Sequence, residues 1–166
     1  MEWPRKCDSV AYDRACSEYD SSNIVQAGLN ESDIECASIY VSKLNRSWET
    51  AGILFPDREY IEANIGEVPL KSYKDSSSLK PLWVWNFLGR FQWYFNNRRQ
   101  DEVKAETVAR CEQVINKLSA KGDDCVLVTH GFFMRTLVKC LKKQGYHVKG
   151  NSIAVGNLQV IVAECK

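Results

Sequence analysis

The spacing of apolar positions changes around residue 130, and the change predicts a strand followed by a helix. Residues 125–128 (CVLV) form a short apolar run rich in β-branched side chains, which is typical of a strand covered on both faces. His130 follows this run at a predicted strand-to-helix junction, where backbone N–H groups and the helix dipole favour an anion. The helical spacing that follows is carried by Met134, Leu137, Val138 and Leu141.

The same kind of pattern predicts further elements in the N-terminal part of the chain. Residues 9–12 (SVAY) are predicted to form a first strand, followed by a polar loop over 13–32 that contains no helix. A second strand is predicted at 36–41, and a helix at 46–55 that ends before a proline. A β-like segment is predicted at 59–65.

Aromatic residues at 83, 87, 91 and 95 recur every four positions and predict a helix over residues 81–95 with an aromatic stripe. We interpret this stripe as part of the core. Because it follows a serine-containing loop at 71–80, a lid over a pocket is the alternative interpretation.

The clearest helical pattern covers residues 102–121, and β-like runs are predicted at 152–155 and 158–163. This alternation of strands and helices predicts an α/β fold of three layers, with a mainly parallel central sheet flanked by helices. With 166 residues, the chain is long enough to bury a substantial core, and we predict a single domain over residues 1–166.

Composition narrows the function classes. A formal net charge of +1 gives no electrostatic footprint for nucleic acid, so no nucleic-acid partner is expected. The seven cysteines include no CxxC pair, so we expect no disulfide framework and no zinc knuckle, and a reducing, cytoplasmic location. The sequence contains no metal-ligand constellation and no nucleotide-binding fingerprint, so we expect no metal site and no cofactor. No window is apolar enough to predict a membrane span or a membrane anchor.

Several charged residues follow predicted strands. Arg14 follows the first strand, Arg46 the second, and His130 the strand at 125–128. Because the carboxyl ends of parallel strands meet at one crevice, these three side chains would form an anion pocket, and guanidinium groups match phosphate oxygens in pairs. Glu62, in the β-like segment, is the candidate acid that would protonate a leaving alkoxide.

Four separate motifs occur in one order along residues 36–166. The stretch SIYVSKLNRSWETA fits the pattern Ser-x-Leu-x-Arg-x-x-x-Thr-Ala around Arg46, Glu62 precedes Gly66 by four residues, VLVTHG ends at Gly131, and Glu102 precedes Arg110 by eight. Together these motifs resemble the histidine phosphatase superfamily, which contains cofactor-dependent phosphoglycerate mutases and many small phosphatases. The resemblance implies a phosphoglycerate mutase-like fold.

In that superfamily the first strand ends in a nucleophilic histidine that forms a phosphohistidine. The corresponding stretch here is Arg14-Ala15-Cys16, so Ala15 stands where the nucleophile is expected. An alanine methyl cannot accept a phosphoryl group. The resemblance therefore implies a crevice that binds phosphate or a small phosphomonoester through Arg14, Arg46 and His130, with phosphoryl transfer impaired or lost and no mutase activity expected.

The alternative is an active phosphomonoester phosphatase, so the sequence leaves open whether the protein is an enzyme. Water would attack directly with Glu62 or His130 as acid or base, or Cys16 would attack as a thiolate favoured by neighbouring arginines. We interpret Cys16 as an inert small residue. His147, the only other histidine of the sequence, is interpreted as an exposed loop residue.

Overall fold

The computed structural model describes residues 3–24, 31–151 and 158–165. The chain divides into two compact units. Unit 1 comprises Met1–Ser22 and Val68–Thr107, and unit 2 comprises Asn23–Glu67 and Val108–Lys166. The single domain over residues 1–166 stays a prediction, because a compact unit need not fold on its own.

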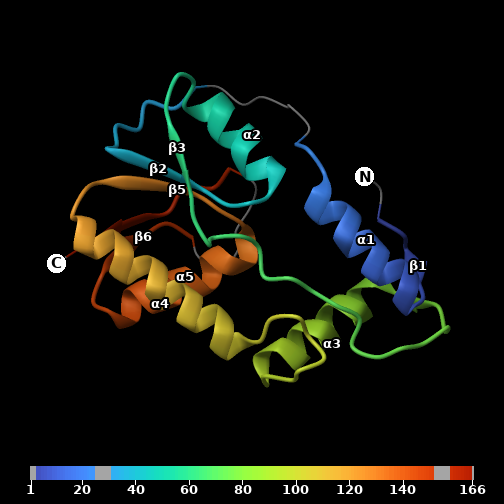
Figure 1. The fold of residues 1–166 in the computed structure, drawn as a ribbon. Coiled ribbons are helices and arrows are strands. Elements are labelled where there is room, and N and C mark those ends of the chain that lie inside the picture. Colours follow the sequence, from blue (N-terminus) through green and yellow to red (C-terminus); the bar gives the residue numbers. More distant parts are fainter. Residues whose placement is uncertain (1–2, 25–30, 152–157, 166) are drawn as a thin grey trace. The chain divides into compact units, whose positions relative to one another are not determined.

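Unit 2 contains a three-stranded parallel sheet, shown in Figure 1, with β2 (Ser38–Val41) between β3 (Tyr60–Glu62) and β5 (Cys125–Val128). Val41 pairs with Glu62 on one side and with Val128 on the other. The carboxyl ends of all three strands therefore lie at the same edge of the sheet, as the sequence predicted. β2 is buried along its whole length, whereas β5 is half-buried.

Helices cover both faces of this sheet. On one face, α2 (Asn45–Leu54) packs through Ala51 against a buried cluster that includes Ile39 and Val41. Figure 1 shows α4 (Lys104–Lys121), of which Val108 onward belongs to unit 2, on the other side of the sheet from α2. The predicted three-layer α/β arrangement is confirmed, and the helices predicted at 46–55 and 102–121 are present with ends shifted by one or two residues.

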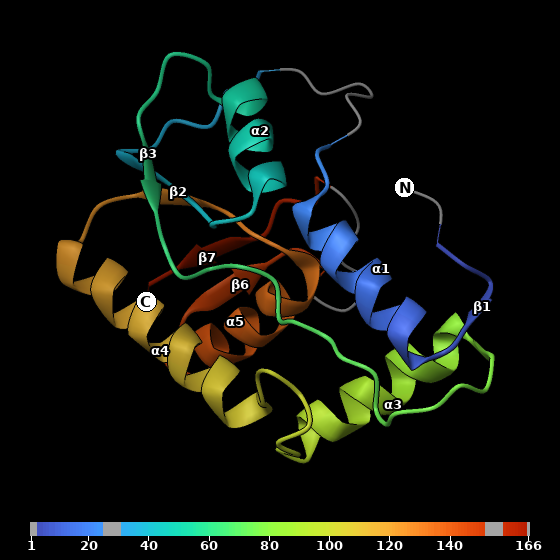
Figure 2. The ribbon, with the colours of Figure 1, turned by 45° about the vertical axis from the view of Figure 1, so that its right-hand side comes forward.

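The C-terminal part of unit 2 begins with α5 (Gly131–Lys143), which buries Phe133, Leu137 and Val138. It contacts β6 (His147–Lys149), which pairs with β7 (Val162–Glu164) in an antiparallel hairpin visible in Figure 2. The β-like run predicted at 158–163 is confirmed only at its end. The run predicted at 152–155 lies outside the described residues.

The N-terminal part of unit 1 contradicts the sequence prediction. Residues predicted as a strand and a loop form one helix, α1 (Ser9–Ser21). Asp8 caps it, since its carboxylate accepts a hydrogen bond from the Ala11 N–H at 2.8 Å. Tyr12 and Ala15 are buried on one face of α1. Two buried positions three residues apart are a weak periodic signal, so the short apolar run was mistaken for a strand.

The rest of unit 1 packs against α1. β1 (Lys6–Cys7) pairs with β4 (Lys80–Pro81), which leads into α3 (Leu82–Tyr94). Trp85 of α3 is fully buried beside Tyr12, and its Nε1–H donates to the Cys7 carbonyl at 3.0 Å. Tyr12 donates its hydroxyl to Asn86 Oδ1 at 2.7 Å.

The helix α3 carries aromatic side chains on two opposite faces, and the prediction about them is wrong. The buried face consists of Trp85, Gly89 and Trp93. A Cβ atom at Gly89 would lie 2.8 Å from Leu70 Cδ1 and 3.0 Å from the Lys71 carbonyl, so only glycine allows this close packing. The stripe that the sequence assigned to the core is exposed instead, with exposed fractions of 68% for Trp83, 63% for Phe87, 52% for Phe91 and 63% for Phe95.

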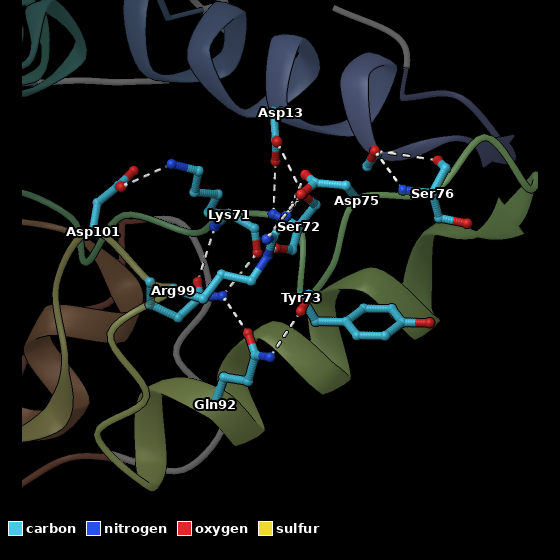
Figure 3. A network of polar contacts seen from close by, with 11 residues as sticks. Asp13, Lys71, Ser72, Tyr73, Asp75, Ser76, Gln92, Arg99 and Asp101 are labelled. Carbon is cyan, nitrogen blue, oxygen red and sulfur yellow. Dashed lines mark hydrogen bonds and ion pairs between the residues drawn. The ribbon is translucent and has the colours of Figure 1, made fainter.

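The segment predicted as a loop at 71–80 has little regular structure, yet many polar contacts hold it in unit 1 (Figure 3). Ser72 is fully buried, and Asp13 accepts hydrogen bonds from its N–H at 2.6 Å and its hydroxyl at 2.9 Å. Arg99 Nε donates to the Ser72 carbonyl at 2.7 Å, and Gln92 Nε2 donates to the Tyr73 carbonyl at 2.8 Å. These bonds fix the loop beside α1 and α3.

Candidate anion-binding site

His130 lies directly after β5 at the N-cap of α5, as the change in apolar spacing predicted. Its side chain is buried, with an exposed fraction of 8%. The ring nitrogen Nε2 lies 2.7 Å from Ser42 Oγ, and Nδ1 accepts a hydrogen bond from Arg46 Nε at 3.3 Å. Side chains that follow two neighbouring strands therefore meet at the carboxyl edge of the sheet.

These contacts assign the tautomer of the neutral imidazole. A guanidinium N–H can only donate, so Nδ1 must present a lone pair to Arg46, and the ring proton lies on Nε2. Nε2–H then donates to Ser42 Oγ, which also accepts from the Leu44 N–H at 3.2 Å. With both acceptor positions of Ser42 used, its hydroxyl proton is directed to another acceptor.

Ser47, in the first turn of α2, holds the two strand ends together. Its hydroxyl accepts from the Ser42 N–H at 3.0 Å and donates to the Val128 carbonyl at 2.5 Å. One side chain thus links the residue after β2, the start of α2 and the end of β5. Sequence reasoning missed Ser47, since it occupies a variable position between Arg46 and Thr50 of the Ser-x-Leu-x-Arg-x-x-x-Thr-Ala pattern.

A carboxylate of the chain occupies the N-terminus of α5. The two oxygens of Glu67 accept hydrogen bonds from the N–H groups of Phe132 at 3.2 Å and Phe133 at 3.1 Å. The sequence predicted an anion at this helix end, and Glu67 is such an anion. Sequence reasoning missed it because Glu67 precedes α5 by more than sixty residues, and nothing in the local pattern connects them. Nearby, Thr129 donates its hydroxyl to the Ile65 carbonyl at 2.5 Å.

The structure brings Arg46 and His130 into contact in unit 2, where Glu62 also ends a strand of the sheet, whereas Arg14 belongs to unit 1. Glu62 is exposed at the carboxyl end of β3 and lines a pocket of about 230 Å³ with Arg110 and Lys117 of α4. Neither Arg46 nor His130 lines that pocket. Arg14 lies exposed in the middle of α1, in unit 1. Its predicted position after a strand is therefore wrong.

Ala15 and Cys16, which follow Arg14, also lie in α1 and not at the end of a strand. Ala15 is buried within α1, so its comparison with a nucleophile at the end of a strand stays a prediction that no strand supports. Cys16 packs against the cluster of Cys7, Tyr12 and Trp85. Burial raises the pKa of the Cys16 thiol to about 11 and outweighs the lowering by Arg90, so the thiol is protonated at neutral pH.

The remaining candidates do not add a second reactive centre. His147 is exposed on β6, a short strand where a loop was predicted. Within the described parts of the chain, no group of three or more His, Cys, Asp or Glu side chains is arranged to hold a metal ion. No helix among the described residues is long and apolar enough to cross a membrane.

Comparison with known proteins agrees with the geometry at the sheet edge. The family model of the histidine phosphatase superfamily (branch 1) matches residues 23–166. The chain belongs to the histidine phosphatase superfamily. Its α/β fold with the parallel β3-β2-β5 sheet is consistent with the phosphoglycerate mutase-like fold of this superfamily. No match was found among curated proteins or among solved structures.

The superfamily match includes some of the predicted site residues and leaves out others. Arg46, Glu62 and His130 lie inside the matched residues 23–166, whereas Arg14, Ala15 and Cys16 precede them. The match therefore includes unit 2 and the part of unit 1 between Val68 and Thr107, but not α1.

Proposed function

We propose that this member of the histidine phosphatase superfamily binds phosphate monoesters at the carboxyl edge of the unit 2 sheet, through Arg46, His130 and Ser42. The observation that carries the proposal is the buried imidazole of His130 between a serine hydroxyl and a guanidinium. An anion gains from the positive charge of Arg46 and from the hydroxyl proton of Ser42, and desolvation strengthens both interactions.

Glu67 affects how a phosphate would be held. Because its carboxylate already takes two N–H groups of α5, a bound phosphate relies on side chains more than on those two N–H groups. A negative charge at this helix end also disfavours a second phosphate close by, so the proposed ligand is a small monoester.

We also propose that phosphoryl transfer is impaired. The covalent route implied by the superfamily requires a nucleophilic histidine in addition to the one that resembles His130. The only other histidine of the sequence is His147, which is exposed on β6. Cys16 is no substitute, since burial keeps its thiol protonated. The roles of Arg14 as a phosphate ligand and Glu62 as an acid remain predictions, and the phosphate-release measurements described below test them.

Calorimetric titration with inorganic phosphate, vanadate and p-nitrophenyl phosphate tests binding. We expect His130→Ala and Arg46→Ala each to weaken binding by about 30-fold, the effect of losing one charge-assisted hydrogen bond. His147→Ala and Arg58→Ala are matched controls on the surface of unit 2 and should bind as the wild type does. Wild-type protein that binds none of these anions, or His130→Ala protein that binds them equally well, would refute the site.

Phosphate release from a panel of monoesters tests the second part of the proposal. We expect no turnover above the His130→Ala background. Turnover that His130→Ala abolishes and Cys16→Ala leaves intact would instead identify a phosphatase that uses water. The same panel with Glu62→Gln and Arg14→Ala shows whether either residue takes part.

A further inference from the structure

The exposed face of α3 is an aromatic surface that the proposed phosphate site does not use. We define the aromatic face as Trp83, Phe87, Phe91, Tyr94 and Phe95, each of which is more than half exposed. The rings at its C-terminal end touch one another, with centroids 4.6 Å apart for Phe91 and Phe95 and 5.2 Å apart for Tyr94 and Phe95. Successive positions four residues apart keep the face continuous along the helix.

The opposite face of α3 already anchors the helix in unit 1. Trp85 donates its Nε1–H to the Cys7 carbonyl, and Trp93 donates its Nε1–H to Thr107 Oγ1 at 3.0 Å. Gly89 allows the segment with Leu70 and Lys71 to pack directly on the helix. The aromatic face is therefore additional to what holds α3 in place, and exposing it to water has a cost in free energy.

The charges around the aromatic face favour an uncharged protein surface as its partner. Along Leu82–Tyr94 the sequence has one charged residue, Arg90, which donates to the Val68 carbonyl at 3.1 Å. Beyond the helix, three cations pair with carboxylates: Arg98 with Glu106, Arg99 with Asp75, and Lys71 with Asp101. The ammonium of Lys104 lies 3.7 Å from the centre of the Tyr94 ring, at the C-terminal end of the aromatic face. A membrane-surface helix or a platform for single-stranded nucleic acid needs a row of basic residues beside its aromatic residues, and α3 has none.

The size of the aromatic face fits a dimer interface. At roughly 200 Å² for each aromatic side chain, five that are slightly more than half exposed present about 600 Å² of surface. This equals the largest apolar patches of ordinary monomers and approaches the roughly 800 Å² that each partner contributes to a standard interface. Among the described residues, the aromatic face has one ring-bound cation, Lys104, at the Tyr94 end, so its other rings can pack against a copy of the same face without opposite charges.

We propose that α3 of one protomer packs against α3 of a second copy of this chain through the aromatic face. Under two-fold symmetry the same residues meet on both sides, with Phe87 and Phe91 near the axis and Trp83 of each copy toward Phe95 of the other. The ridge formed by every fourth side chain packs into the equivalent groove at a crossing angle of about 50°.

Sedimentation of the full chain between about 1 and 100 μM tests this pairing, because specific dimers of this interface size dissociate in or below that range. We expect a dimer, and we expect Phe87→Glu to raise its dissociation constant by about 100-fold because two carboxylates would be buried at the axis. Val10→Glu is the matched control, since Val10 is also an exposed apolar residue of unit 1, with an exposed fraction of 65%, and it should leave the dimer unchanged.

A second variant keeps the test valid if Phe87→Glu folds poorly. Phe87→Ala/Phe91→Ala keeps good helix formers in α3 and should weaken the dimer while circular dichroism stays unchanged. Wild-type protein that is monomeric at the highest concentration would overturn the proposal, as would a dimer that Phe87→Glu and the double variant leave intact. Binding of the monomer to phosphatidylserine vesicles that Phe87→Glu abolishes would overturn it in favour of a lipid partner. His130→Ala should dimerise normally, so the two proposals can fail separately.

Discussion

Two polar networks, one in each unit, combine serine and arginine for different purposes. In unit 2, Ser42 and Arg46 both direct their polar groups at the neutral ring of His130. In unit 1, Ser72 is bound by the carboxylate of Asp13, and Arg99 is held by an ion pair with Asp75 at 2.6 Å. The residue types are alike, and in the second network carboxylates of the chain accept from the serine and the arginine.

The difference shows what separates a structural network from a candidate binding site. In unit 1 the negative charge that the donors need belongs to the chain, so the network is complete and holds the loop of Figure 3. In unit 2, Arg46 Nε donates to the neutral ring of His130, and the proposed phosphate would interact with the positive charge of Arg46. Variants that remove or replace single residues of either network test this comparison.

Asp13→Ala should have the largest effect, and it should affect stability alone. The change leaves the N–H and hydroxyl of the fully buried Ser72 without their acceptor, which costs about 3 kcal/mol of unfolding free energy. Denaturant unfolding measures the loss. Glu18→Ala, at an exposed position of the same helix, is the control. If the two variants unfold alike, Asp13 does not hold the loop.

Ser47→Ala should come second and should affect both stability and binding. It removes the acceptor of the Ser42 N–H and the donor to the Val128 carbonyl, at a cost of about 2 kcal/mol. Because Ser42 and His130 lose their shared support, phosphate affinity should fall as well. Thr50→Ala, which removes a hydroxyl bonded only to the Arg46 carbonyl within α2, is the control. Lost stability with unchanged phosphate affinity would show that Ser47 does not position the site.

The sequence predicted the parts of the fold that depend on long, regular patterns. The helices α4 and α5 have apolar residues on one face over several turns, and the strands before Arg46 and His130 are clear apolar runs. In contrast, α1 buries few residues and begins with Val10-Ala11-Tyr12, which looks like a strand. In α3, both opposite faces carry aromatic residues, and the exposed face has more of them than the buried one, so the aromatic periodicity indicated the wrong face as buried.

Part of the candidate site could likewise be predicted from the sequence. Arg46 and His130 meet because parallel strands in register end at one edge, and that rule can be applied to a sequence. The prediction for Arg14 failed together with its strand. Ser47 and Glu67 act on backbone groups far away in the sequence, so only the folded chain reveals them.

Arg46→Lys should lower phosphate affinity by about tenfold, less than the alanine variant does. Lysine keeps the positive charge but lacks the Nε–H that donates to His130 Nδ1, so the ring loses the contact that fixes its tautomer. Calorimetric titration with phosphate measures the change. Arg58→Lys is the control, since Arg58 donates only to the Cys36 carbonyl at the surface. Full wild-type affinity in Arg46→Lys would mean that charge alone matters at this position.

Asp75→Asn should have the smallest effect, because Asp75 is exposed and its ion pair with Arg99 is screened by water and salt. The hydrogen bond from Arg99 holds the pKa of the Asp75 carboxyl below its ordinary value of 3.8. The pair therefore stabilises the folded protein above that pH, and this contribution is lost as the pH falls through the lowered pKa of the folded state. In low salt, Asp75→Asn should melt slightly below the wild type at pH 6 and together with it at pH 2, whereas Asp33→Asn, at an exposed position in unit 2, should show no difference. An equal decrease in melting temperature at both pH values would show that Asp75 acts through packing, and the charges of the unit 1 network would then have no part in holding its loop.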